Sequence, residues 1–525
     1  MIKKISQAMP WLFLALCLVF VIGTYALYGA HNMDSDVASE MVLADLLNRE
    51  GALLSSNWYY STELRTVSPV PLYQLALKLF PGSWHAARTL SLALLLAGTA
   101  ASLIYMARGA LMREGAVYAA AAMLLPVSEV HRFLFSHGGF YTVYVILGAL
   151  LIGLTLRMGA NWRGYRLALL AVLGLWGGLA GVRMPMIVGV PLFMVCALNA
   201  CGRLLKGKSF GALWRTSSGR MLAACGVMLA AMFAGYLVNV LVYAPRYHYE
   251  QHMDLALSMP SLPLLWQQIS YIAGFFGFGS SSRLLSAGGI AQLAMLLVTV
   301  LMGAAGCMLL VRRRMLDARA RVLVGFALCA VAAGALLNVI MGKTDNPYAV
   351  GYYMLGVFAL AALLFMALER AACRRAWLPR AAMTLLACIF LAQGVMFMRN
   401  HIRRETSAHE EAAAWLMENG YTAGYATFWN GNVLTEAADG NLDLYVYSSW
   451  QDETLYDWLQ ETRHLEVAPE GPVFVFVSGE EFYGKTVPAA QADRLVFTSE
   501  TYGSRIYRYE SAADVDALQR AQSMK

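Results

Sequence analysis

The sequence predicts a polytopic α-helical membrane protein with a small α/β domain at its C-terminal end. Of its 525 residues, 59% are hydrophobic and only 14% are charged, which is more apolar than a soluble protein of this size requires. The apolar residues gather in runs that approach the roughly 20 residues needed to cross a bilayer. After about residue 400 the pattern changes to short segments typical of alternating strands and helices.

About eleven runs are expected to span the membrane. They are 11–30, 86–107, 115–127, 140–156, 165–180, 186–200, 221–243, 287–310, 322–341, 349–368 and 377–397. The first run follows Lys3 and Lys4 and has no cleavage site of small residues, so it is expected to be an uncleaved span. The apolar run 262–278 is expected to lie at the interface or to be re-entrant, because a crossing there would reverse the side of Arg312–Arg314.

The basic residues predict the orientation. Five loops rich in arginine and lysine, among them 157–166 and 312–321, fall on the same side as Lys3 and Lys4. The positive-inside rule makes that side cytoplasmic. The net charge of +7 is explained by these anchors and does not indicate a nucleic-acid partner. The sequence therefore predicts a multi-pass plasma-membrane protein whose N-terminus is cytoplasmic.

The polar segments fall on the opposite, extracytoplasmic side. They are 31–85, 128–139, 244–286 and everything after about residue 400. None of the eight cysteines lies in these segments, which excludes disulfides and cysteine-bound metals there. Two domains are expected, a transmembrane domain over 1–400 that includes the outer loop 31–85, and an extracytoplasmic α/β domain over 401–525.

Asp34 and Asp36 are the leading functional candidates, since both follow the first span directly. An ionisable residue beside the apolar phase costs free energy unless it has a partner or a role. The alternative is a carboxylate that caps the following helix, and this alternative is nearly as strong for Asp36. A divalent metal between the two aspartates is possible, although no His/Asp cluster of convincing spacing accompanies them.

Several motifs follow these aspartates in order. Ser39-Glu40 comes first, then Pro69-Val-Pro71-Leu72-Tyr73, Ala87-Arg88 at the start of the second span, Gly178-Leu-Ala-Gly-Val-Arg183-Met-Pro185, and Gly342-Lys343-Thr-Asp-Asn-Pro347-Tyr348. Together with Asp34 they resemble the GT-C class of membrane glycosyltransferases. The resemblance is to the family of dolichyl-phosphate-mannose protein mannosyltransferases and bacterial aminoarabinose transferases. It covers most of residues 10–400 and includes the extracytoplasmic α/β domain.

The chain departs from this family at two positions. Ser68 stands where family members often have a lysine before the proline-rich helix, and 136–139 lacks the second acidic residue of the next outer loop. The nearest acidic residue to that loop is Glu129.

The resemblance implies transfer of a sugar from a polyprenyl-phosphate donor to an extracytoplasmic protein, lipid or cell-wall glycan. Asp34 would be the general base, and Asp36 a second base, a metal ligand or a cap. The implied donor-binding set is Arg65, Arg88, Arg183, Lys343, Tyr348 and Tyr73. For Arg183 and Lys343, snorkelling to the interface is an equal alternative. A flippase for lipid-linked sugars, which would place its charges near mid-span, and a non-catalytic membrane scaffold are the competing functions.

The last 125 residues predict a small α/β fold. Strands are expected at 423–428, 442–447, 473–477, 494–498 and 504–509, and helices at 405–420 and 454–463.

Overall fold

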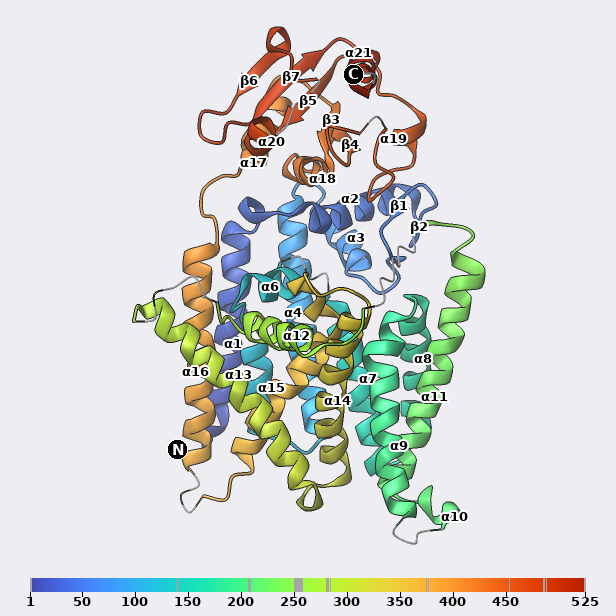
Figure 1. Ribbon diagram of the computed structural model, residues 1–525, viewed down its shortest axis with the longest axis vertical. Coiled ribbons are helices and arrows are strands. Elements are labelled where there is room, and N and C mark those ends of the chain that lie inside the picture. Colours follow the sequence, from blue (N-terminus) through green and yellow to red (C-terminus); the bar gives the residue numbers. More distant parts are fainter. Residues whose placement is uncertain are drawn as a thin grey trace.

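The structure is a computed structural model. It describes residues 2–523 apart from Gly138, Phe140, 206–208, 250–257, 280–282, Leu284, Arg374, Ala376, Glu453, 485–486 and Pro488. A bundle of long helices carries a layer of short helices at one end, and a region with a five-stranded sheet lies beyond that layer (Figure 1). We call this end, which is at the top of Figure 1, the upper end. Parts of the expected outer segment 244–286 lie outside the described residues.

Nine helical segments among the described residues are long and apolar enough to cross a membrane. They are α1 (Ile2–Tyr28), α4 (Trp84–Gly109), α7 (Thr142–Ala160), η3 with α9 (Pro185–Gly189, Val190–Leu204), α11 with η4 (Ser217–Val238, Asn239–Tyr243), α13 (Ala287–Val311), α14 (Ala318–Ile340), η6 with α15 (Pro347–Tyr353, Met354–Glu369) and α16 (Trp377–His401). The protein is a multi-pass membrane protein, as expected.

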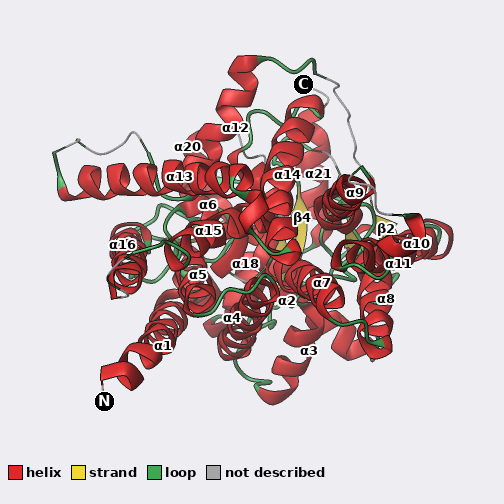
Figure 2. Ribbon diagram, turned by 90° about the horizontal axis from the view of Figure 1, so that it is seen from below, coloured by secondary structure: helices red, strands yellow, loops and turns green. Residues whose placement is uncertain are grey.

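Two of the eleven expected spans are shorter helices. The helix α5 (Glu114–Leu124) has 11 residues and is buried from Gly115 onwards, so neighbouring helices enclose it. The helix α8 (Gly164–Leu179) packs against α11 at the edge of the bundle (Figure 2). A Cβ on Gly178 of α8 would lie 2.0 Å from the carbonyl oxygen of Met232, so the two backbones touch. Close helix contacts through glycine are typical of membrane interiors.

The layer at the upper end is built mainly by the segment after the first span. It contains η1 (Ala30–Asn32), α2 (Ser35–Glu50), the two-residue strand β1 (Tyr59–Tyr60) and α3 (Val70–Leu79). Strand β1 pairs in parallel with β2 (His248–Tyr249). Two further short helices, α6 (Glu129–His131) and η2 (Arg132–Ser136), lie between α5 and α7 along the chain. Outside the layer, α10 (Phe210–Leu213) and η5 (Arg313–Met315) connect the spans.

The apolar run after residue 261 forms α12 (Leu262–Phe275). With 14 residues it is shorter than the roughly 20 residues that span a bilayer. It lies across the long helices rather than along them (Figure 1). This arrangement agrees with the expected interfacial helix.

The C-terminal region is an α/β fold with a mixed sheet in the order β4-β3-β5-β7-β6. Its elements are α17 (Ala408–Glu418), β3 (Ala423–Thr427), α18 (Phe428–Ala437), β4 (Asp443–Tyr447), α19 (Arg463–Glu466), β5 (Val473–Val477), α20 (Gly479–Gly484), η7 (Ala492–Arg494), β6 (Leu495–Thr498), β7 (Arg505–Tyr509) and α21 (Ala512–Ser523). Strands β4, β3 and β5 are parallel, while β7 is antiparallel to both β5 and β6. All five expected strands are present.

The helix expected at 454–463 was wrong. The Tyr456 amide donates to the Val446 carbonyl of β4, and the Leu459 amide donates to the Tyr59 carbonyl of β1. Leu459 has a positive φ of 49°, which a helix does not allow. Its side chain packs with Trp58 and Tyr60 of the upper layer. Pairing with two strands therefore takes the place of the local helical preference.

Candidate functional site

Asp34 and Asp36 mark the start of α2. Asp34 is the N-cap, and its carboxylate accepts a hydrogen bond from the Asp36 amide at 3.0 Å. Asp36 lies within the first turn of the helix, so the capping alternative that was open for both aspartates applies to Asp34. Burial raises the pKa of the Asp34 carboxyl, while the amides of Asp36 and Val37 oppose this rise. Burial and the neighbouring Asp34 charge raise the pKa of Asp36 to about 6.

Glu40 lies one helical turn beyond Asp36 and is 1% exposed. Within the described residues, neither of its carboxylate oxygens has a hydrogen-bond partner. The nearest cation is the Arg65 guanidinium, with 3.8 Å between Nη1 and Oε1. Burial raises the pKa of Glu40 to about 7, although Arg65 and Arg88 oppose the rise. Asp36, Glu40 and Arg65 therefore form one electrostatic group.

The segment that carries Arg65 also borders a cavity of about 330 Å³. Thr62, Glu63 and Leu64 line it on one side. The connection between α8 and η3 and the upper ends of α11, α14 and η6 line the rest. Most of the wall is apolar, and the charged residues on it are Glu63, Arg183 and Lys343. Ligand cavities commonly combine an apolar wall with a few convergent polar groups.

Arg183 sits in a cage of aromatic and acidic side chains. Its Nε lies 2.8 Å from Oε1 of Glu63. The guanidinium carbon lies 5.0 to 5.1 Å from the ring centroids of Tyr141, Tyr144 and Tyr352, at distances typical of cation–π contacts. The Tyr144 hydroxyl donates to the other oxygen of Glu63 at 2.9 Å. Both oxygens of Glu63 are therefore engaged.

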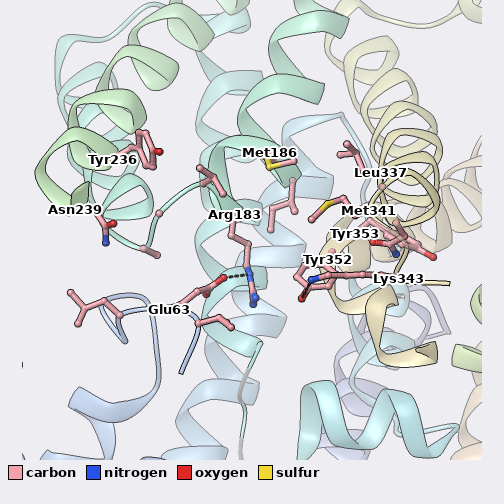
Figure 3. A pocket seen from close by; sticks show the side chains of 18 of the residues that line it. Glu63, Arg183, Met186, Tyr236, Asn239, Leu337, Met341, Lys343, Tyr352 and Tyr353 are labelled. Atoms are coloured by element: carbon pink, nitrogen blue, oxygen red, sulfur yellow. Dashed lines mark hydrogen bonds and ion pairs between the residues drawn. The ribbon is translucent and has the colours of Figure 1, made fainter. Parts of the chain in front are cut away.

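Lys343 faces the same cavity from the opposite side (Figure 3). Its Nζ donates to the Tyr352 hydroxyl at 3.0 Å, and in the described part of the chain no carboxylate forms an ion pair with it. The wall thus holds two cations and one carboxylate. This charge balance favours an anionic ligand.

Tyr348 belongs to a second group beside Asp34. It is 36% exposed and packs edge-on against Phe133 with 5.1 Å between the ring centroids. Arg132 holds Glu129 in a two-point ion pair. Both of these charges act on the pKa of Asp34, so Glu129 is a further acidic group near the aspartates in addition to Glu40.

Arg88 and Tyr73 lie away from the cavity. The Arg88 side chain is completely buried, and Nε and Nη2 donate to the two oxygens of Glu436 at 2.6 and 2.7 Å. Its guanidinium lies 4.8 Å from the Tyr73 ring, which is also fully buried. These contacts tie α4 to α18 of the C-terminal region. We therefore leave Arg88 and Tyr73 out of the proposed donor-binding set.

Among the described residues, no three His, Cys, Asp or Glu side chains gather in a way that could hold a metal ion. The pair Asp34 and Asp36 therefore has no third ligand of these types in that part of the chain. We propose no metal-dependent step.

Sequence reasoning missed Glu63 and the three tyrosines around Arg183. Glu63 stands two residues before Arg65 in the outer loop. Tyr141, Tyr144 and Tyr352 belong to apolar runs, where aromatic residues are ordinary. Only their convergence on one guanidinium distinguishes them, and that convergence depends on the packing of distant segments.

No protein-family model and no curated protein sequence matches the chain. Solved structures do match. The crystal structure of ArnT from Cupriavidus metallidurans in the apo state has a TM-score of 0.60 and 12% identity, covering 97% of this chain and 99% of that one. The same protein bound to undecaprenyl phosphate gives a TM-score of 0.54, again at 12% identity, covering 96% and 98%.

The fold is GT-C-like. This confirms the fold class that the sequence motifs implied, a polytopic helical membrane protein with a C-terminal α/β region. At 12% identity the likeness concerns the fold alone. The narrower resemblance to mannosyltransferases and aminoarabinose transferases stays a prediction.

Proposed function

We propose that this protein is a glycosyltransferase that moves a sugar from a polyprenyl-phosphate donor to an acceptor outside the cytoplasm. The observation that carries the proposal is the cavity with Arg183 and Lys343 on its wall, within a GT-C-like fold. The ArnT structure in complex with undecaprenyl phosphate has the same overall fold, which supports a lipid phosphate as ligand.

In this proposal the donor phosphate lies between Lys343 and Arg183. Hydrogen bonds from charged donors to phosphate are roughly twice as strong as those between neutral groups. The apolar part of the wall, which includes Met186, Ile187 and Leu337, suits the first isoprene units. Arg65 links this region to Asp36 and Glu40, so the sugar would extend toward the start of α2.

The proposed reaction needs one base and a stabilised leaving group. The acceptor hydroxyl oxygen attacks the anomeric carbon, and the bond from that carbon to the phosphate oxygen breaks. The electron pair of the broken bond stays on the phosphate, where the cations stabilise it. The hydroxyl proton passes to Asp34, which acts as general base. Polyprenyl phosphate is the second product.

The orientation belongs to the same proposal. The arginine-rich loops, which include η5, would be cytoplasmic, and the upper end with the C-terminal region would be extracytoplasmic. The site would then face the side on which lipid-linked sugars meet their acceptors.

The proposal is tested with detergent-solubilised protein, a panel of radiolabelled undecaprenyl-phosphate sugars and a cell-envelope extract that supplies acceptor hydroxyl groups. Wild-type protein should release undecaprenyl phosphate from one donor of the panel. Arg183→Ala and Lys343→Ala should each weaken binding of undecaprenyl phosphate, because each removes a charge-assisted contact. If the wild type binds undecaprenyl phosphate but turns over no donor, a transporter explains the fold better. If it binds neither, the scaffold alternative is favoured.

A further inference from the structure

Glu63 places a negative charge on the wall of a cavity that we propose binds an anion. It lines the cavity together with Arg183 and Lys343 (Figure 3). One oxygen pairs with Arg183 at 2.8 Å, and the other accepts the Tyr144 hydroxyl at 2.9 Å. Glu63 is thus held against the cation that a phosphate would need. A phosphate can reach Arg183 fully only if it competes with this carboxylate.

The two lipid phosphates of the proposed reaction differ in charge. A sugar-bearing donor is a phosphodiester and carries one negative charge. The product is a monoester, whose second ionisation has a pKa of about 6, so it carries nearly two charges at neutral pH. A site with cations alone would therefore bind the product more tightly than the donor. Turnover would then be limited by release of the product.

We propose that Glu63 is an internal competitor that weakens binding of the dianionic product and so promotes its release. This inference rests on the proposed function. Repulsion between Glu63 and a phosphate grows with phosphate charge, so the carboxylate penalises the monoester more than the diester. As the product leaves, Glu63 returns to Arg183 and keeps the buried guanidinium paired.

The test measures equilibrium binding of undecaprenyl phosphate and of its methyl phosphodiester at pH 8. Glu63→Gln should bind the monoester about tenfold more tightly than the wild type does, and the diester only about threefold more tightly. At pH 5 the monoester carries about one charge, so Glu63→Gln should increase the affinity for the monoester and for the diester by the same factor. A merely structural role for Glu63 would not separate the two lipids.

Two further variants keep the result interpretable. Glu114→Gln removes a carboxylate that pairs with Arg380 away from this cavity, and it should change neither affinity. Tyr144→Phe removes the hydrogen bond that the Tyr144 hydroxyl donates to Glu63. It should also increase the affinity for the monoester, but by less than Glu63→Gln does. It also serves if Glu63→Gln does not fold.

One contradicting result is a wild type that binds both lipids while Glu63→Gln and Tyr144→Phe bind the monoester no more tightly than the wild type does. That result would overturn the role of Glu63 and leave the proposed function standing. A wild type that binds neither lipid would overturn the proposed function, and the competitor role with it.

Discussion

Asp34 has a structural and a proposed chemical task at the same time. Its carboxylate caps α2 through the Asp36 amide, and it lies among charges that act on its pKa, Arg132 and Glu129. Asparagine is as good an N-cap as aspartate, whereas alanine costs about 1 kcal/mol. The two tasks can therefore be separated by the choice of substitution.

We expect Asp34→Asn to keep the melting temperature of the wild type while sugar transfer falls by about 10²-fold or more. Asp34→Ala should lose both activity and part of the helix stability. Asp36→Asn should be milder than Asp34→Asn. Transfer from an undecaprenyl-phosphate sugar and thermal unfolding are measured on the same preparations. Wild-type turnover in Asp34→Asn would remove Asp34 as the base.

Glu40 should make stability depend on pH. Its pKa is raised from an ordinary 4.5 to about 7, so the folded protein binds this proton more tightly than the unfolded chain. The resulting stability is fully present below about pH 4.5 and is lost as the pH rises toward 7. Glu40→Gln keeps the shape without the charge. It should stabilise the protein at pH 8 by at most on the order of 3 kcal/mol.

The measurement for Glu40 is the melting temperature in detergent from pH 5 to pH 8. The stability of the wild type relative to Glu40→Gln should fall across this range. The buried histidines His131, His137 and His409, whose pKa values are lowered, act in the opposite direction but contribute equally to both proteins. Asp36, with a pKa of about 6, contributes in the same direction as Glu40 in both proteins. An unchanged slope in Glu40→Gln would contradict burial as the cause of the raised pKa of Glu40.

At the scale of single residues, sequence patterns predicted the positions of the main charges better than their partners. Arg183 and Lys343 line the cavity. Asp34 caps α2, and Arg65 lies beside Glu40 of that helix. The proposed roles of these residues stay predictions. Arg88 shows why the partners could not be predicted, because its partner Glu436 is 348 positions away along the chain. No local pattern encodes such a pairing.

At the scale of elements, the contact between α4 and α18 joins the bundle to the C-terminal region. The Arg88–Glu436 pair is supported by a hydrogen bond from Arg88 to the Val37 carbonyl of α2 and by one from the Ser35 hydroxyl to the Phe428 carbonyl. Breaking one side of a buried ion pair leaves an uncompensated charge, which typically costs 3–5 kcal/mol.

Arg88→Met should therefore lower the melting temperature strongly, and the double variant Arg88→Met/Glu436→Gln should recover much of the loss. Binding of undecaprenyl phosphate should persist in the double variant, since neither side chain lines the cavity. The measurements are thermal unfolding and lipid binding. Loss of lipid binding in a double variant of recovered stability would return Arg88 to the donor-binding set.

The length of the apolar runs predicted the long helices well, but it predicted short helices and the irregular segment 454–463 less well. Both α5 and α8 were expected as spans, yet they have only 11 and 16 residues, and α5 is buried among its neighbours. The segment 454–463 has helical spacing but pairs with β1 and β4 instead. In each case tertiary contacts decide the outcome, and these contacts are not visible in a local window.

At the scale of the whole molecule, the arginine-rich loops and the C-terminal region lie at opposite ends of the bundle (Figure 1). We expect a reporter that is active only outside the cytoplasm to work when it is fused to the C-terminus. The same reporter fused after Arg314 should be inactive, and a cytoplasmic reporter should give the reverse pattern. Cytoplasmic activity at the C-terminus would reverse the orientation and place Asp34 on the wrong side.

The central claim is that the cavity lined by Arg183 and Lys343 holds the phosphate of a polyprenyl lipid. The most direct test is an experimental structure of the wild-type protein with undecaprenyl phosphate. We predict that the phosphate lies between the Lys343 ammonium and the Arg183 guanidinium, with the first isoprene units against Met186 and Leu337. A lipid phosphate bound elsewhere, with this cavity empty at saturating lipid, would contradict the account.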